Sequence, residues 1–428
     1  MKIKELTLTD FKGINKLTIP LNGETTIIFG INGVGKSTIL RAIDLIYANI
    51  IAKLTSKKKK LAELEVDDIS FGRTRAEIDA SFVFEDGYEA SYGRSISREK
   101  KRLHSMTKLK NLVDAFEERY IVKPYDNGGD WIEPIDMKNM PVFVNYGVNR
   151  LVLDVPLRTN KEEFRKLDSF DKAIESKIDF RNLFKWFRNQ EDYENEQKSR
   201  TRYDYEDRSL RAVKTAMLSM LDGFDDIYID RKPLAMKVKK DGRYLKINQL
   251  SDGEKCTIAL FGDLARRMVL ANPGRENPLD GTGVVLIDEL DLHMHVSWQR
   301  KVLNVLKETF PNIQFIITTH SPQILGECGE DMNLFVLTKT GKEIDLSRYT
   351  SFWGWDTNVI LEEALHTPSV NDETASLLSK MYDCIDRKEY DEAEQIADLL
   401  DRKSSGRAYG VAGARVRISR GRRNEKNN

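Results

Sequence analysis

The segment Gly30–Ser37 constrains this chain most, because it fits the phosphate-binding pattern G-x-x-x-x-G-K-S. A short apolar run, Thr25–Phe29, precedes it, and Ser37–Ile51 carries apolar residues at helical spacing. Strand, glycine loop and helix form the setting in which backbone N–H groups and a helix N-terminus surround phosphate oxygens. The segment therefore predicts an α/β fold of the P-loop type.

The same pattern assigns residues to a nucleotide. We expect Lys36 to contact the β- and γ-phosphates of ATP, and the Ser37 hydroxyl to bind Mg²⁺. The remaining loop residues expected to contact ATP are Asn32, Gly33, Val34, Gly35 and Thr38. The alternative is a tight turn that merely uses glycine, and Lys-Ser at this offset favours the phosphate loop.

Four further motifs follow in order: Leu250–Glu254, the apolar strand Val284–Glu289, Asp291–His295 and Phe315–His320. The strand ends in two acids. We expect Asp288 to hold Mg²⁺ and Glu289 to polarise the attacking water, with a solvated loop acid as the alternative for the latter. Neighbouring side chains of a strand point to opposite faces, so two such roles require the strand to end there.

Together the five motifs resemble the head of ABC-type ATPases. The resemblance implies that His320 senses the γ-phosphate, although a lone histidine is more often structural. It also implies that Leu250–Glu254, which keeps Ser251 and Gly253 of the usual L-S-G-G-Q, contacts ATP on the opposite protomer. An ATP-sandwich dimer with composite sites follows. A plain helix N-cap at Ser251 is compatible with this role.

Two positions leave alternatives open. His293 and His295 could suggest zinc, but a third ligand is not apparent, and Asp291 and His295 suit a dimer-facing loop better. The family glutamine after the strand Pro141–Asn145 is replaced by Tyr146, which is therefore the expected nucleotide contact at that place. The nearby alternatives are Asn145, Asn149 and Arg150.

Other segments resemble particular groups within the ABC-type ATPases. Thr9–Ile14 resembles the start of RecF-, Rad50- and SMC-like heads, where it approaches adenine; Phe11, Lys12 and Gly13 are the matching residues. Ile287–His295 with Trp298-Gln299 looks like OLD-like ATPases. Val144–Arg150 and Trp353–Asp356 resemble the stand-alone anti-phage ATPases of Septu systems, the PtuA family. That resemblance implies a separately encoded partner nuclease of the HNH type.

The predicted fold class is an ABC-type P-loop NTPase head with an antiparallel β-subdomain, a helical insertion and a small helical C-terminal extension. Its expected divisions are 1–94 (N-lobe with phosphate loop and β-hairpin), 95–209 (charged, mainly helical insertion), 210–350 (C-lobe) and 351–428 (helical extension with a basic tail). A helical hairpin is expected at Asn371–Lys403, and the glycine- and arginine-rich tail after it is expected to be loose.

The amino-acid composition says less about possible binding partners than the motifs do. The 428 residues carry 68 basic and 68 acidic side chains, so net charge does not argue for nucleic acid or membrane. Three cysteines without metal-ligand spacing fit a reducing cytoplasm. A membrane-spanning apolar run is not found in the sequence. The Lys57–Lys60 run and the Arg402–Lys426 tail are basic; each is a solvated face or a contact to DNA or a partner protein.

The leading hypothesis is a homodimeric, or larger, Mg²⁺-dependent ATPase that senses phage infection and regulates the nuclease. The alternative is a RecF-like DNA-repair ATPase that binds DNA. A transporter head is disfavoured by the N-terminal segment. A self-contained OLD-type nuclease is disfavoured because only about a hundred residues follow His320, without a recognisable nuclease motif.

Overall fold

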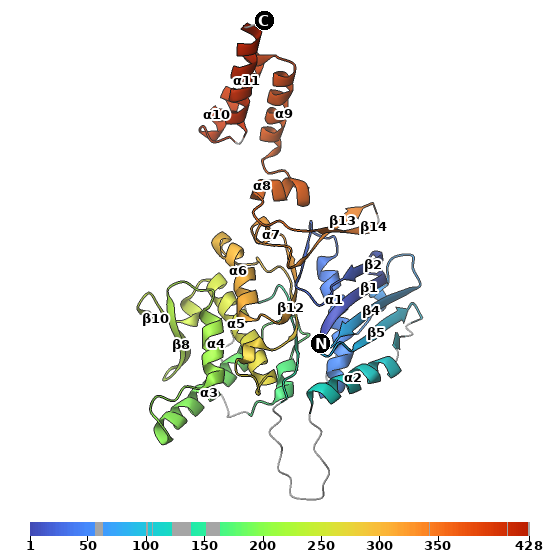
Figure 1. Cartoon of the computed structure of the whole chain (residues 1–428), viewed down its shortest axis with the longest axis vertical. Helices are drawn as coiled ribbons and strands as arrows, with labels where there is room; N and C mark the ends of the chain where they lie inside the picture. Colours follow the sequence, from blue (N-terminus) through green and yellow to red (C-terminus); the bar gives the residue numbers. More distant parts are fainter. Residues whose placement is uncertain are drawn as a thin grey trace, which may run out of the picture. The chain divides into compact units, whose positions relative to one another are not determined.

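The computed structural model describes residues 1–55, 63–99, 102–104, 106–121, 138–150, 163–341, 343–408 and 410–426. The chain divides into two compact units, Met1–Trp355 and Asp356–Asn428 (Figure 1). All five nucleotide-handling motifs lie in the first unit. The predicted Lys57–Lys60 contact lies outside the described residues.

A six-stranded sheet in the order β14-β13-β3-β12-β11-β7 forms the centre of the first unit. The strands are β3 (Thr26–Phe29), β7 (Val142–Tyr146), β11 (Gly283–Ile287), β12 (Ile313–Thr319), β13 (Asn333–Thr340) and β14 (Glu343–Tyr349). All are parallel except β14, which pairs antiparallel with β13. Every residue of β3, β7, β11 and β12 is buried, as expected for parallel strands covered on both faces. The predicted α/β class is confirmed.

A second, antiparallel sheet has the order β2-β1-β4-β5-β6. Its strands are β1 (Lys2–Phe11), β2 (Ile14–Pro20), β4 (Arg75–Val83), β5 (Glu89–Ser97) and β6 (Arg102–His104). The predicted hairpin is confirmed as β4 and β5, paired from Arg75↔Ser97 to Val83↔Glu89. At its turn Gly87 has a φ of 82° and donates its N–H to the Phe84 carbonyl at 3.0 Å.

Helices pack around these sheets. They are α1 (Lys36–Thr55), α2 (Met106–Tyr120), α3 (Phe180–Arg200), α4 (Arg208–Leu218), α5 (Asp252–Ala271), α6 (Val296–Thr309) and α7 (Pro322–Leu325), with 3-10 turns at Val66–Asp68, Lys166–Phe170, Ile247–Gln249 and Pro278–Asp280. The strands before the signature segment form a separate sheet of β8 (Phe224–Arg231), β9 (Leu234–Lys240) and β10 (Arg243–Lys246). Region 95–209 holds α2 and α3, and it also supplies β7 to the central sheet.

The second unit begins with α8 (Thr357–Val359) and a π-helical turn (Ile360–Ala364), and it continues as α9 (Asp372–Asp386), α10 (Tyr390–Ser404) and α11 (Val411–Lys426). Helices α9 and α10 confirm the predicted hairpin. The expectation of a loose tail after them is wrong, because α11 packs on the hairpin. Its residues Val411, Ala414 and Ile418, at helical spacing, join one core with residues of α9 and α10.

Ion pairs hold the basic helix α11 to α10. Arg415 lies 2.7 Å from Asp398 and 2.8 Å from Asp401. Arg422 lies 2.7 Å from Asp391 and also pairs with an acid of the following turn. The sequence shows an arginine-rich tail, and in the structure these two arginines pair with acids of α10.

Across the described part of the chain, none of the helices combines the length and the apolar character that crossing a membrane requires.

Candidate functional site

The phosphate loop lies where β3 ends and α1 begins, at the carboxyl edge of the parallel strands. Glycine is needed for its path. Gly30, Gly33 and Gly35 have φ values of 142°, 79° and 103°, which L side chains rarely adopt. A Cβ on Gly30 would also lie 2.4 Å from the Leu337 carbonyl oxygen. The first turn of α1 thus opens directly onto the loop, as anion binding requires.

Lys36 folds back over this loop. Its Nζ donates to the carbonyls of Gly30 at 2.9 Å and Ile31 at 3.0 Å, and the side chain is buried. Burial lowers the pKa of Lys36 to about 8, while the carboxylates of Glu289 and Asp288 act in the opposite direction. The ammonium is thereby held over the centre of the loop, near both acids.

Ser37 and Asp288 meet, although 251 residues separate them. The Ser37 hydroxyl donates to Asp288 Oδ1 at 3.2 Å, and Thr318 Oγ1 donates to the same oxygen at 2.5 Å. Adjacent hydroxyl and carboxylate oxygens are the hard donors that Mg²⁺ prefers. The two residues predicted as metal ligands therefore fit Mg²⁺, and Thr318 is a supporting residue that the sequence did not single out.

Glu289 begins a sharp turn after β11. Its φ of 48° lies in the left-handed region, which costs a non-glycine residue about 1–2 kcal/mol. The Glu289 N–H donates to Thr318 Oγ1 at 2.8 Å, and the Leu290 N–H donates to the Thr318 carbonyl at 3.0 Å. This turn ends the strand alternation directly after Asp288, as two different roles for the two acids require.

His320 directly follows β12, whose last residue pairs with the end of β3 at the phosphate loop. Its backbone N–H donates to Asp291 Oδ1 at 3.3 Å, and the Thr319 hydroxyl donates to the same oxygen at 2.6 Å. Partial burial, followed by the positive charge of Lys36, lowers the pKa of His320. The imidazole is therefore neutral at pH 7 and can donate or accept one hydrogen bond near Lys36.

Both interpretations of the signature segment are compatible with its geometry. Ser251 caps α5: its hydroxyl accepts the Glu254 N–H at 3.4 Å, and Glu254 accepts the Ser251 N–H at 2.8 Å. A Cβ on Gly253 would lie 2.5 Å from the His293 carbonyl oxygen. Glycine at 253 is therefore required by close packing within one protomer, whatever the loop contacts in a second one.

The histidine pair does not form a metal site among the described residues. Nδ1 of His295 lies 2.8 Å from the Ser297 hydroxyl, and His295 caps the start of α6. Neither His293 nor His295 belongs to a cluster of three metal-ligating side chains within the described ranges. His295 thus has a local structural role, and the zinc alternative gains no support.

The three residues expected to approach adenine, Phe11, Lys12 and Gly13, differ in their exposure to solvent. The Phe11 side chain is fully buried, so its expected contact with the base is wrong for the ring. Lys12 has a φ of 46°, and its ammonium lies 3.3 Å from Asp68. The Gly13 N–H donates to the Ser70 hydroxyl at 2.9 Å. Lys12 and Gly13 stay at the surface, beside the fully exposed ring of Phe71, which the sequence did not single out.

Tyr146 does not face a nucleotide. It is fully buried, and its hydroxyl donates to Asp263 of α5 at 2.9 Å. Burial first, and then the charge of Asp263, raise the pKa of Tyr146 well above its usual value, so the phenol keeps its proton. The predicted contact at this position is therefore wrong. Of the alternatives Asn145, Asn149 and Arg150, the last reaches the site and donates to the backbone carbonyls of Asp288 and Glu289.

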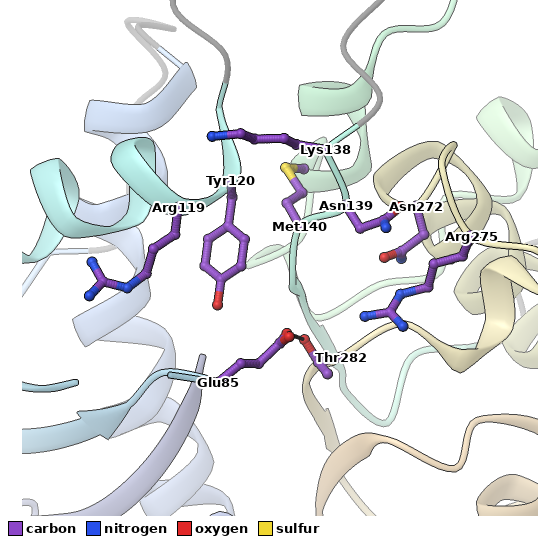
Figure 2. Close-up of a pocket in the computed structure, with 9 residues that line it drawn as sticks. All are labelled: Glu85, Arg119, Tyr120, Lys138, Asn139, Met140, Asn272, Arg275 and Thr282. Atoms are coloured by element: carbon purple, nitrogen blue, oxygen red, sulfur yellow. Dashed lines mark hydrogen bonds between the residues drawn. The ribbon is translucent and has the colours of Figure 1, made fainter. Parts of the chain in front are cut away.

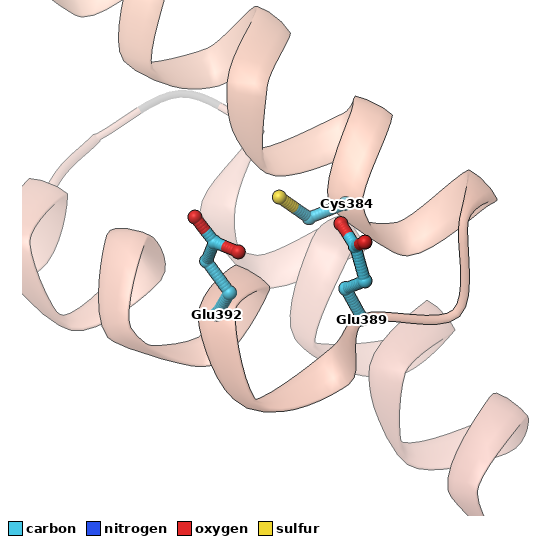
Figure 3. Close-up of side chains that lie close together, drawn as sticks. All are labelled: Cys384, Glu389 and Glu392. Atoms are coloured by element: carbon cyan, nitrogen blue, oxygen red, sulfur yellow. The ribbon is translucent and has the colours of Figure 1, made fainter.

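Two further polar groupings are formed by residues that do not belong to this site. A cavity of about 350 Å³ opens between Glu85, Tyr120, Arg275 and their neighbours (Figure 2). One of its cations, Arg119, is already paired with Asp86 at 2.7 Å. In the second unit, Cys384, Glu389 and Glu392 come together (Figure 3), but both acids are exposed and the thiol belongs to the helical core. Neither grouping assigns a ligand.

Two family models match the chain. "AAA domain" matches residues 5–209, and "AAA domain, putative AbiEii toxin, Type IV TA system" matches residues 144–326. The chain is 29% identical to the "Retron Ec83 probable ATPase" of Escherichia coli, over 80% of this chain and 72% of that one. It is 27% identical to the "Retron Vc95 probable ATPase" of Vibrio cholerae, over 93% and 86%.

Septu proteins are also similar: the match to PtuA of Bacillus thuringiensis is 25% identical over 85% of this chain and 84% of that one. A solved SMC head bound to a winged-helix domain of ScpA has a TM-score of 0.49 and 18% identity, covering 82% of this chain and 98% of that one. The family models, the named ATPases and the motif set agree. The chain is an ATPase of the ABC/AAA type, related to the retron and Septu ATPases.

Proposed function

We propose that this ATPase works as an ATP-sandwich dimer that regulates a separately encoded nuclease in anti-phage defence. One observation carries the catalytic half of the proposal: the 3.2 Å contact that joins Ser37 of the phosphate loop to Asp288 at the end of β11. It supports one compact site for a nucleotide and a divalent cation.

Each residue of this site has a proposed role in hydrolysis. Lys36 neutralises the β- and γ-phosphates, and His320 donates to the γ-phosphate. Glu289 takes a proton from water while the water oxygen attacks the γ-phosphorus and the bond to ADP breaks. Mg²⁺ held by Ser37 and Asp288 would supply positive charge to the phosphates.

The dimer is proposed from the signature segment. Ser251 and Gly253 stand at the N-terminus of α5, where backbone N–H groups suit a phosphate. In the resembling ATPases this segment meets the nucleotide of the second protomer. Two composite sites would then make hydrolysis depend on dimer formation.

The partnership with a nuclease rests on the retron and Septu relatives and on the resemblance of Val144–Arg150 to Septu ATPases. The second unit is the proposed docking element, because it is compact by itself and contains none of the ATPase motifs. A compact bundle outside the catalytic unit can bind a partner without disturbing the site.

Co-expression with the nuclease encoded beside this gene tests the proposal. We expect the two proteins to co-purify, and nuclease activity to differ between ATP and ADP for the wild type but not for Lys36→Ala. A nuclease that neither binds nor responds to nucleotide would contradict it. Salt-sensitive binding of duplex DNA by the ATPase alone would instead favour the RecF-like alternative.

A further inference from the structure

Arg150 stands in the loop after β7, beyond Tyr146, which takes the place of the family glutamine, and it points into the protein. The residue is 2% exposed, so its guanidinium is almost wholly removed from water. Its own N–H donates to the Val148 carbonyl at 3.0 Å, which fixes the backbone of the loop. Such a buried cation needs hydrogen-bond acceptors in the protein, because it has lost those of water.

Its acceptors are the backbone carbonyls of the two acids. Nη2 of Arg150 donates to the Asp288 carbonyl at 3.0 Å and also to the Glu289 carbonyl. The nearby carboxylates of Asp288 and Glu289 therefore stay free of the guanidinium contact and remain available to the cation and the water. Nε of Arg150 has no partner within the described part of the chain.

The same turn is fixed from its other side. Asp288 donates its N–H to the Tyr146 carbonyl at 2.8 Å, and Glu289 donates its N–H to Thr318 Oγ1 at 2.8 Å. Donors of the turn thus bond to β7 and β12, while its carbonyls bond to Arg150. Without Arg150, the Asp288 carbonyl would lose this donor and the Glu289 carbonyl would keep only the Leu292 N–H at 2.9 Å, so the left-handed φ of 48° at Glu289 would lose one of its restraints.

We infer that Arg150 is a positioning residue, which holds the Asp288–Glu289 turn so that the Glu289 carboxylate faces the attacking water. Arg150 thereby ties the loop after β7 to the catalytic acid. This inference rests on the proposed role of Glu289. It also explains why arginine is present: one planar Nη2 carries two hydrogens that serve two adjacent carbonyls, and a lysine ammonium lacks this fixed geometry.

Kinetics of Arg150→Ala and Arg150→Lys test the inference. We expect kcat to fall by about 10–100-fold in Arg150→Ala, as misplacement of a catalytic group by about 1 Å does, with KM for ATP within about twofold of wild type. Guanidinium ion at millimolar concentration should restore part of the lost kcat, and urea at equal concentration should not. Arg150→Lys should retain more activity than Arg150→Ala.

Arg267→Lys is the matched control. Arg267 is also a fully buried arginine, but it bonds to Asp263 and the Ser169 carbonyl and donates to neither carbonyl of the turn. Its kcat should stay near wild type. An equal loss of kcat in Arg267→Lys and Arg150→Lys would overturn the inference, because the effect would then belong to any buried arginine.

A double-mutant cycle with Glu289→Gln separates the positioning role of Arg150 from the proposed role of Glu289 as the base. If Arg150 acts through Glu289, Arg150→Ala should lower the residual single-turnover rate of Glu289→Gln by less than about twofold. The same fold loss in both backgrounds would overturn the positioning role. A wild-type rate for Glu289→Gln alone would instead overturn the proposed base, and this measurement is made first.

Discussion

At the scale of residues, the site depends on contacts between side chains far apart in sequence. Lys36 and Ser37 follow β3, Asp288 follows β11 and His320 follows β12, and all of them meet at the carboxyl edge of one sheet. Opposite charges lie close together in the site: the buried Lys36 ammonium is near the carboxylates of Asp288 and Glu289. The neutral His320 imidazole lies near the same ammonium. This arrangement suits a ligand that is anionic and carries a divalent cation.

Lys36→Ala should abolish ATP binding, because it removes the one cation that the phosphate loop places over its own centre. Isothermal titration calorimetry measures this directly. Lys53→Ala, on the exposed side of the same helix, is the control and should bind ATP normally. Binding of ATP to Lys36→Ala near wild-type affinity would contradict the assignment of this lysine.

Asp44 predicts a pH dependence of stability. It is buried on α1, where Asn145 and Ser176 donate to its Oδ2. Burial raises the pKa of Asp44 from 3.8 to about 8 in the folded protein. Between these values the folded state keeps the proton that the unfolded state has lost, so the free energy of unfolding should decrease as pH rises from about 4 to about 8.

Asp44→Asn should remove this dependence, because the amide stays neutral at every pH. Urea unfolding from about pH 5 to about pH 9 should show a flatter profile for Asp44→Asn than for wild type, with the largest advantage of the variant at the alkaline end. The exposed Glu276→Gln is the control. Parallel profiles for wild type and Asp44→Asn would show that Asp44 is not protonated in the folded state.

At the scale of elements, the helix α5 connects the proposed dimer contact to the core. Ser251 caps its start, and Asp263 in its middle accepts from Tyr146 and pairs with Arg266 and Arg267 at 2.8 Å each. A change at the signature segment therefore acts on a helix that is anchored against β7. The effects of a lost cap and of a lost contact between protomers need to be separated by experiment.

Ser251→Arg should block hydrolysis while ATP still binds to the single protomer, because the bulky cation would clash at the phosphates of the second protomer. Mixing it with Lys36→Ala should restore part of the phosphate release, since one composite site of the mixed dimer is intact. Ser251→Ala, which loses the cap at a typical cost of about 1 kcal/mol without adding bulk, is the control. No recovery on mixing two folded proteins would argue against shared sites.

The elements could be predicted from the sequence where local signals agree. The phosphate loop, the β4–β5 turn and the α9–α10 hairpin each depend on glycine placement or apolar spacing within a short segment. Tyr146 and α11 could not be placed correctly, because a distant partner decides each. Tyr146 turns inward to Asp263, and α11 becomes ordered because its apolar residues complete a core that α9 and α10 begin.

At the scale of the whole molecule, catalysis and partner binding are proposed for different units. The unit Met1–Trp355 contains every ATPase motif, and Asp356–Asn428 has its own small core. The proposal therefore predicts that the two activities can be separated genetically. A cut inside the second unit would not test this, because losing α11 would expose Met381 and the rest of that core.

Truncation after Trp355 should leave basal ATP hydrolysis within about twofold of wild type and abolish both nuclease co-purification and protection against phage. A protein ending at Trp355 that still captures the nuclease would show that the partner binds the ATPase unit.

The most direct test of an ATP-sandwich dimer in which Glu289 activates water is the phosphate-release rate of Glu289→Gln together with the mass of this variant in solution. The amide keeps the shape of the side chain and loses the base, so hydrolysis should fall by about 10²–10⁴-fold while ATP still binds. The variant should then accumulate as an ATP-bound dimer, seen by light scattering with ATP and not with ADP. Wild-type turnover, or a monomer that persists with ATP, would contradict an ATP-sandwich dimer in which Glu289 activates water.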